Sequence, residues 1–245
     1  MKIRRIYSSN FNKKRRSCKS IKFLIIHYTG MQSERESIIR LCNSKSKVSS
    51  HFVINQKGKI YRLVQENQIA WHAGKSCWGK YKNLNKNSIG IELANKGHKF
   101  GYTNFHKKQI SSLIKLCKKL IKEYKIKKEN IIGHSDIAPL RKIDPGEKFP
   151  WDELAKKDIG IWHRCKPTFL KKFRKVKILT KEEKVKFIKN LKNIGYCFLN
   201  KKNYFFKKIL IAFQRHYRKE LINGLLDMEC YIIAENLSKN LKKTS

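Results

Sequence analysis

The segment 131–146 carries the densest set of side chains in this chain that could do chemistry. It places an imidazole at His134 and a carboxylate at Asp144, on one loop stiffened by prolines and glycines. A second imidazole, His27, ends a short apolar run. Two histidines and one carboxylate leave an open position on a tetrahedral Zn²⁺, which is the pattern of a catalytic rather than a structural site. We therefore predict His27, His134 and Asp144 as zinc ligands, although a lone histidine at a strand end more often simply packs.

A zinc site that activates water also needs a base to accept the proton of that water. Glu92 is a carboxylate in an otherwise apolar run, and burial in a cleft would raise its pKa toward the range of a general base. Lys142, two residues before Asp144, could stabilise the oxyanion of a tetrahedral intermediate. The competing interpretations are a solvent-facing carboxylate on an edge strand and one more surface lysine among many.

Strands and helices of an α/β layer fold are expected to position these groups. Apolar and alternating runs predict strands at 23–27, 51–55, 59–64 and 88–94, the middle two forming a hairpin, with a loop over 71–87. Apolar residues at three- and four-residue spacing predict a helix of about twenty residues that Thr103 caps. A weaker helix is expected over 34–41, with Ser33 as its N-cap.

The composition changes after Trp162. Residues 163–179 show little periodicity and are predicted to be a linker. Thr180 to Glu183 has the capping-box pattern, and three helical segments follow, at 181–196, 204–219 and 228–241, the last capped by Asp227. A three-helix unit of about sixty residues is predicted, and it would be marginal as an isolated fold.

The chain is strongly basic, with 58 Lys and Arg against 18 Asp and Glu and a formal net charge of +40. Such an excess favours polyanionic partners, whether nucleic acid, anionic lipid or an acidic wall polymer. The basic residues spread along the whole chain, however, which favours compositional drift. The densest cluster lies in residues 1–20, which we predict to be a mobile basic arm. No helix-turn-helix or aromatic-plus-basic RNA motif is present, so no specific nucleic-acid binding is expected.

Seven cysteines are present and none forms a C-x-x-C pair. The odd number excludes a complete disulfide framework but leaves one or two bridges open, and reduced thiols are the favoured interpretation. No stretch approaches the roughly 20 apolar residues of a membrane span. The basic arm lacks the apolar middle of a signal peptide, and no lipid-attachment cysteine follows an apolar run.

Five motifs occur together in one order along the chain: Ile26–Thr29, Trp71–Gly74, Ser88–Glu92, Gly133–Pro139 and Arg141–Gly146. They resemble the motifs of the zinc-dependent N-acetylmuramoyl-L-alanine amidases, and AmiD-type enzymes are the most similar branch. The resemblance covers roughly residues 21–162. It implies the fold of peptidoglycan recognition proteins, a mixed central β-sheet flanked by helices, and a zinc hydrolase that cleaves the amide between N-acetylmuramic acid and L-alanine in peptidoglycan or muropeptides.

The resemblance also implies a role for each matching position. His27, His134 and Asp144 would bind zinc, Glu92 would be the general base, and Lys142 would stabilise the transition state. Tyr28, Trp71 and His72 would line the substrate groove. Because every catalytic position is present, the resemblance argues against the non-catalytic recognition proteins of this fold. A binding module whose catalysis has decayed remains the alternative of a different class.

The C-terminal motifs 191–196, 212–218 and 224–227 resemble the small three-helix peptidoglycan-binding domain of AmiD-type enzymes. The expected organisation is therefore a basic arm (1–20), a zinc amidase domain (21–162), a linker (163–179) and a three-helix peptidoglycan-binding-like domain (180–245), in a monomer. The missing export signal predicts a cytoplasmic location. The alternative is the periplasm or outer membrane, as for exported AmiD-type enzymes.

Overall fold

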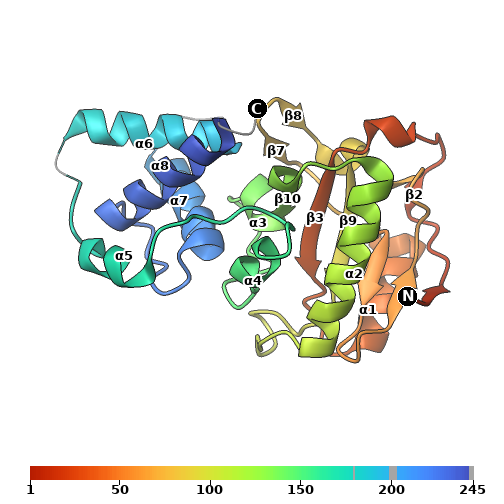
Figure 1. Cartoon of the computed structure of the whole chain (residues 1–245). Helices are drawn as coiled ribbons and strands as arrows, with labels where there is room; N and C mark the ends of the chain where they lie inside the picture. The colour runs from red at the N-terminus through yellow and green to blue at the C-terminus, as the bar shows by residue number, and fades with distance from the viewer. Residues whose placement is uncertain (179, 199–202, 243–245) are drawn as a thin grey trace.

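A six-stranded mixed β-sheet forms the centre of the computed structural model, which describes residues 1–178, 180–198 and 203–242 (Figure 1). The strand order is β1 (Ile3–Arg5), β5 (Ile60–Arg62), β4 (Phe52–Ile54), β9 (Ser88–Leu93), β3 (Phe23–Tyr28) and β10 (Ile131–Gly133). All neighbours are parallel except the β4–β5 pair, which is the predicted hairpin. The predicted mixed central sheet flanked by helices is confirmed.

Helix α2 (Lys107–Tyr124) packs its apolar face, including Leu113 and Leu120, on one face of this sheet. The helix begins three residues later than expected, with His106 as N-cap, so the prediction that Thr103 caps it is wrong. The physical reason is a competing contact: the backbone carbonyl of Thr103 accepts a hydrogen bond from the Asn95 side chain at 2.9 Å, and the segment before the helix stays in a loop.

Smaller elements surround the sheet. Helix α1 (Glu34–Cys42) starts as predicted, with the Ser33 hydroxyl accepting a hydrogen bond from the Glu36 amide at 3.1 Å. The predicted loop over 71–87 contains two short strands and a 3₁₀ turn. The remaining short elements are β2 (Phe11–Asn12), β6 (Ile69–Ala70), β7 (Cys77–Trp78), β8 (Tyr81–Lys82), α3 (His134–Ile137), α4 (Trp151–Ala155), and the 3₁₀ turns η1 (Cys18–Ser20), η2 (Ser44–Ser46), η3 (Leu84–Asn87) and η4 (Lys128–Asn130).

The basic N-terminal segment is part of the fold, so the prediction of a mobile arm is wrong. Strand β1 pairs with β5, and β2 pairs with β6. The Arg16 side chain is buried and donates hydrogen bonds to the backbone carbonyls of Glu66, Asn85 and Ser88. These long-range contacts order the segment despite its charge.

Three helices form the C-terminal unit: α6 (Lys181–Ile194), α7 (Asn203–Tyr217) and α8 (Met228–Lys242). The capping box at Thr180 is present, and the Asp227 carboxylate accepts a hydrogen bond from the Cys230 amide at 2.9 Å, so both predicted caps are confirmed. The segment predicted as a linker contains a short helix, α5 (Pro167–Phe173). Parts of the predicted linker and helical domain, at 179, 199–202 and 243–245, lie outside the described residues.

The C-terminal helices do not stand apart from the sheet. Phe187 and Phe213 belong to the same apolar cluster as Ile25, Ile132 and Ile137, which come from β3, β10 and α3. In Figure 1 the helical unit lies beside α3 and β10, on the side of the sheet away from α2. A shared core therefore stabilises a unit that would be marginal alone.

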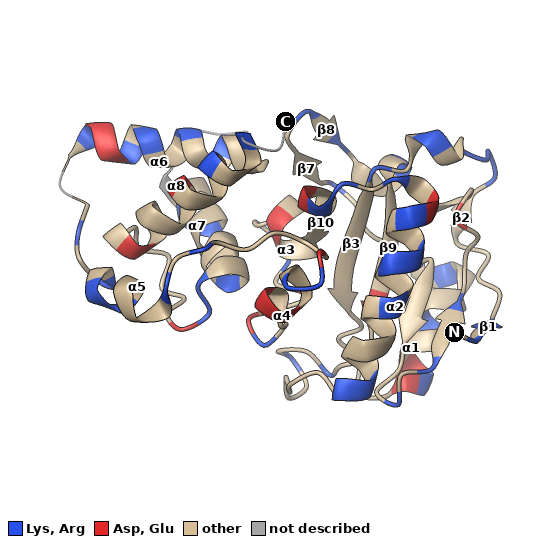
Figure 2. Cartoon of the chain, in the orientation of Figure 1, with Lys and Arg blue, Asp and Glu red and all other residues tan. Residues whose placement is uncertain are grey.

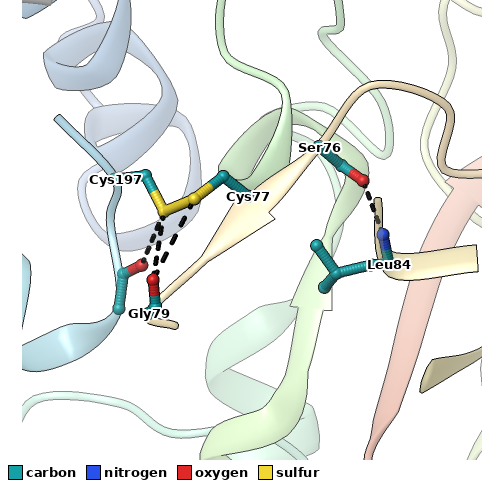
Figure 3. The surroundings of a disulfide bond; sticks show 6 residues. Ser76, Cys77, Gly79, Leu84 and Cys197 are labelled. Carbon is teal, nitrogen blue, oxygen red and sulfur yellow. Dashed lines mark hydrogen bonds between the residues drawn. A yellow bond between two sulfur atoms is a disulfide. The ribbon is translucent and has the colours of Figure 1, made fainter. Parts of the chain in front are cut away.

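A disulfide joins Cys77 of β7 to Cys197 beyond α6, across 120 residues of chain (Figure 3). The favoured expectation of reduced thiols is therefore wrong for this pair, because the fold brings two distant cysteines together. The other cysteines, Cys18, Cys42, Cys117, Cys165 and Cys230, are free. The bridge links the sheet unit covalently to the helical unit.

Replacing Cys197 by alanine is expected to lower the free energy of unfolding by about 2–4 kcal/mol, because a bridge across a long loop restricts the unfolded chain. Urea unfolding of the oxidised protein measures this effect. Cys18→Ala, which removes an exposed free thiol, is the matched control. Equal unfolding midpoints for wild type and Cys197→Ala under oxidising conditions would contradict a stabilising bridge.

Basic residues occur over both the sheet unit and the helical unit, without a single charged face standing out in this view (Figure 2). Their spread matches the even distribution of Lys and Arg along the sequence. In the described part of the chain, no helix combines the length and the apolar character that crossing a bilayer requires.

Candidate active site

The candidate site lies where three parallel strands end. His27 is in β3, directly opposite Glu92 of the neighbouring β9 in the strand register. On the other side of β3, Ile26 pairs with Gly133, so that His134 follows immediately after β10 and beside His27. Since paired residues of adjacent strands project to the same face, the register itself brings these side chains together.

Three side-chain atoms converge on one point. His27 Nδ1 lies 2.9 Å from His134 Nδ1 and 2.9 Å from Asp144 Oδ2, and His134 Nδ1 lies 3.0 Å from the same carboxylate oxygen. Hydrogen bonds alone fit this triangle poorly, because a ring N–H directed at one partner points away from the other. Among the described residues these three form the group suited to hold a metal ion, and two imidazoles with one carboxylate suit Zn²⁺.

The surroundings of His27 and Asp144 favour the protonation states that a metal ligand needs. Burial, together with repulsion from His134, lowers the pKa of His27 to about 4, so its ring is neutral. His134 Nε2 lies 3.2 Å from the carbonyl oxygen of Ala73 and 3.4 Å from Nη2 of Arg141, and a ring that donates from Nε2 to this carbonyl has a bare Nδ1. Burial alone would raise the pKa of Asp144, but His134 and His27 outweigh it and keep that pKa well below its usual value.

Glu92 lies next to this group with a carboxyl oxygen that is available for chemistry. Its Oε2 atom is buried and has no hydrogen-bond partner within the described chain. Burial and the nearby Asp144 carboxylate raise its pKa well above the ordinary value, and Lys142 opposes that shift. Strand β9 lies between β4 and β3, so the alternative of a carboxylate on an edge strand does not apply.

A cleft of about 560 Å³ opens over the site. Lys142 and the three residues expected in the substrate groove, Tyr28, Trp71 and His72, all line it. Burial raises the pKa of the Tyr28 hydroxyl, which lies 3.0 Å from His98 Nδ1, to about 12.

The other two groove residues are placed differently. Trp71 donates its indole hydrogen to Asn12 at 2.6 Å, so the N-terminal segment holds one wall of the cleft. His72 lies deep in the wall, with only 9% of its surface exposed. Burial and the neighbouring His27 keep the pKa of His72 well below its usual value, so the ring is neutral.

Asp136 is a structural residue of the site that the sequence did not single out. Its carboxylate accepts hydrogen bonds from the Gly133 amide at 2.8 Å, the Tyr196 hydroxyl at 2.6 Å and His216 Nδ1 at 2.7 Å. The helical unit thus braces the short helix that begins with His134. The three-residue spacing of Gly133 and Asp136, at which an acidic side chain can accept from the N-cap amide, is a local signal that could have revealed the first contact, but not the two from the C-terminal unit.

Comparison with known proteins gives a consistent assignment. A family model described as N-acetylmuramoyl-L-alanine amidase matches residues 17–147. The chain is 37% identical to N-acetylmuramoyl-L-alanine amidase AmiD of Escherichia coli over 233 residues, which are 89% of this chain and 82% of that protein. It is 34% identical to 1,6-anhydro-N-acetylmuramyl-L-alanine amidase AmpD of Haemophilus influenzae, over 61% of this chain and 88% of that protein.

Solved structures agree with the sequence comparison. The complex of E. coli AmiD with anhydro-N-acetylmuramic acid-L-Ala-D-gamma-Glu-L-Lys superposes with a TM-score of 0.79 at 34% identity, covering 94% of this chain and 92% of that one. AmpDh3 of Pseudomonas aeruginosa in complex with anhydromuramic pentapeptide gives a TM-score of 0.79 at 30% identity, covering 94% and 96%. Both similarities extend well beyond the sheet unit.

Proposed function

The chain belongs to the N-acetylmuramoyl-L-alanine amidase family, and from this premise we propose that it hydrolyses the amide bond between N-acetylmuramic acid and L-alanine in peptidoglycan or its soluble fragments. The observation that carries the proposal is the convergence of His27, His134 and Asp144 beside the unpartnered carboxyl oxygen of Glu92. A metal-assisted hydrolase needs this combination of metal ligands and a general base.

We propose that Zn²⁺ is the metal and that the three convergent side chains hold it. When bound, zinc would lower the pKa of a water molecule and polarise the carbonyl of the substrate. Glu92 accepts the proton of the attacking water and returns it to the leaving nitrogen of L-alanine. The Lys142 ammonium group stabilises the negative charge that develops on the carbonyl oxygen.

Tyr28 and Trp71 are proposed to contact the substrate, since both line the cleft. Relatives of known structure hold anhydromuramyl peptides, and a ligand of this class is the substrate proposed here. His72 also lines the cleft, but both of its ring nitrogens contact protein atoms. We assign it a different role below.

The C-terminal helices α6 to α8 are proposed to form the peptidoglycan-binding-like unit, with the boundary to the amidase domain in the segment 163–179. Two features support a distinct unit: the change of composition after Trp162 and the capping box that starts α6. Its shared core with the sheet means that the two units would fold and act together.

Replacing Lys142 by methionine is expected to lower kcat about 10²–10³-fold with little change in KM, because the lysine acts on charge that develops only in the transition state. Steady-state hydrolysis of a muropeptide measures both constants. Lys157→Met, in an exposed turn that does not line the cleft, is the matched control. A rise in KM at unchanged kcat would instead assign Lys142 to substrate binding.

The alternative, a peptidoglycan-binding module without catalysis, is tested on the purified full chain. We expect one zinc per chain and multiple turnovers of muropeptide, both removed by a chelator and restored by Zn²⁺. Tight muropeptide binding without turnover by the zinc-loaded protein would establish the alternative and overturn the hydrolase.

A further inference from the structure

His72 occupies a buried position between His27 and a serine. Its Nδ1 lies 3.0 Å from His27 Nε2, and its Nε2 lies 3.2 Å from the hydroxyl oxygen of Ser88. All three side chains are 9% exposed or less. The three groups therefore form a continuous chain of hydrogen bonds that runs from the candidate zinc ligand into the interior.

The direction of these hydrogen bonds follows from a further bond that Ser88 makes. Ser88 donates its single hydroxyl proton to the carbonyl of Leu84 at 2.6 Å. Its oxygen must then accept the proton on His72 Nε2. A neutral His72 that is protonated at Nε2 has a bare Nδ1, which accepts the proton on His27 Nε2. His27 Nδ1 is left with a free lone pair, directed at His134 and Asp144.

Strand β9 leaves space for the ring of His72 at Gly90. A Cβ atom added at Gly90 would lie 2.5 Å from Cγ of His72, which no side chain can occupy without displacing the ring. Glycine weakens the interior of a strand, and its presence there marks a close approach of another group. His51 packs edge-on against the same ring, with centroids 5.6 Å apart, and its Nδ1 accepts the Gly90 amide hydrogen at 3.0 Å. Gly90 and His51 thus both pack against the ring of His72.

We propose that His72 and Ser88 are positioning residues that fix the tautomer and the ring orientation of His27, so that its Nδ1 faces the metal. The role rests on the proposed zinc site. It replaces the expected contact of His72 with substrate, for which no ring nitrogen is left. Outer partners of this kind raise metal affinity because the ligand is already in its binding form before the metal arrives.

The first test needs no variant. Nitrogen-15 NMR of the metal-free full chain distinguishes protonated from bare ring nitrogens. The proposal predicts that His27 carries its proton on Nε2 and that His72 also carries its proton on Nε2. A His27 ring protonated at Nδ1 in the metal-free protein would overturn it.

The second test measures zinc affinity by competition with a chelator. Ser88→Ala and His72→Phe are each expected to weaken zinc binding about 10–100-fold. Ser8→Ala is the matched control, since Ser8 is also buried and donates to a backbone carbonyl, at 2.6 Å, but does not line the cleft and has no hydrogen bond to a histidine of the described chain. The control should bind zinc like the wild type.

The outcomes separate this inference from the proposed function. Zinc affinity of Ser88→Ala and His72→Phe within twofold of wild type would sink the positioning role, even if the wild type cleaves muropeptides. A wild type that binds zinc tightly but cleaves no muropeptide would instead count against the hydrolase and leave the positioning role standing.

Discussion

Glu92→Gln is expected to lower kcat for muropeptide hydrolysis by about 10²–10⁴-fold while the protein keeps its full complement of zinc. Glutamine has nearly the size and shape of glutamate, so the strand register opposite His27 should be preserved. The amide cannot accept a proton at neutral pH, so the attacking water would lose its base.

The raised pKa of Glu92 adds a dependence on pH to this prediction. Burial and the Asp144 carboxylate disfavour ionisation of Glu92, whereas a base must be ionised to act. Activity should therefore rise as pH increases through the pKa of Glu92 in the loaded enzyme. The residual activity of Glu92→Gln should lack that rise. Stoichiometric zinc with wild-type kcat in Glu92→Gln would remove Glu92 from the mechanism.

Asp144→Ala is expected to lose both zinc and activity. Its Oδ2 atom contacts Nδ1 of both His27 and His134, and its carboxylate supplies the negative charge in the proposed metal site. Loss of an outer partner alone costs about 10–100-fold in metal affinity, so loss of a ligand should cost more than about 100-fold. Activity at micromolar zinc should fall below detection.

Chelator competition and metal analysis of the full chain measure this loss. Asp152→Ala is the matched control and should bind zinc normally. Asp152 lies on α4, and its carboxylate pairs with Lys219 at 3.6 Å. An Asp144→Ala protein that retains one tightly bound zinc would show that the metal sits elsewhere.

The candidate ligands could be named from the sequence because their residue types suit zinc and their motifs follow the order found in the amidases. The structure adds that His27 lies in β3 and that His134 directly follows the neighbouring parallel strand, so both lie at the same end of the sheet. The caps at Ser33, Thr180 and Asp227 were predictable because the groups that form a cap lie a few positions apart. The predicted cap at Thr103 failed, since Asn95 bonds to its carbonyl and the segment stays in a loop.

Features that depend on distant contacts were not predictable in this way. The charge of residues 1–20 suggested mobility, but Arg16 finds buried backbone acceptors 50 or more residues away. The pairing of Cys77 with Cys197 requires the helical unit to be docked on the sheet. The contacts of Asp136 with Tyr196 and His216 require the same docking.

The order of hydrogen bonds around His72 was hidden for another reason. The sequence shows a histidine in a motif shared with amidases, which suggested a residue of the groove. Only the folded structure shows that Ser88 and Gly90 of β9 lie against its ring. A glycine inside an apolar strand was the one local signal of a close approach.

Hydrolysis of the amide between the sugar and the peptide is tested most directly by mass spectrometry of a defined muropeptide, in its anhydro and non-anhydro forms, after digestion with the zinc-loaded full chain. We predict two products that together gain one water: an N-acetylmuramic acid with a free lactyl carboxyl group, and a stem peptide with a free L-alanine amine. Intact substrate of both forms, or cleavage within the glycan or within the peptide, would contradict the account.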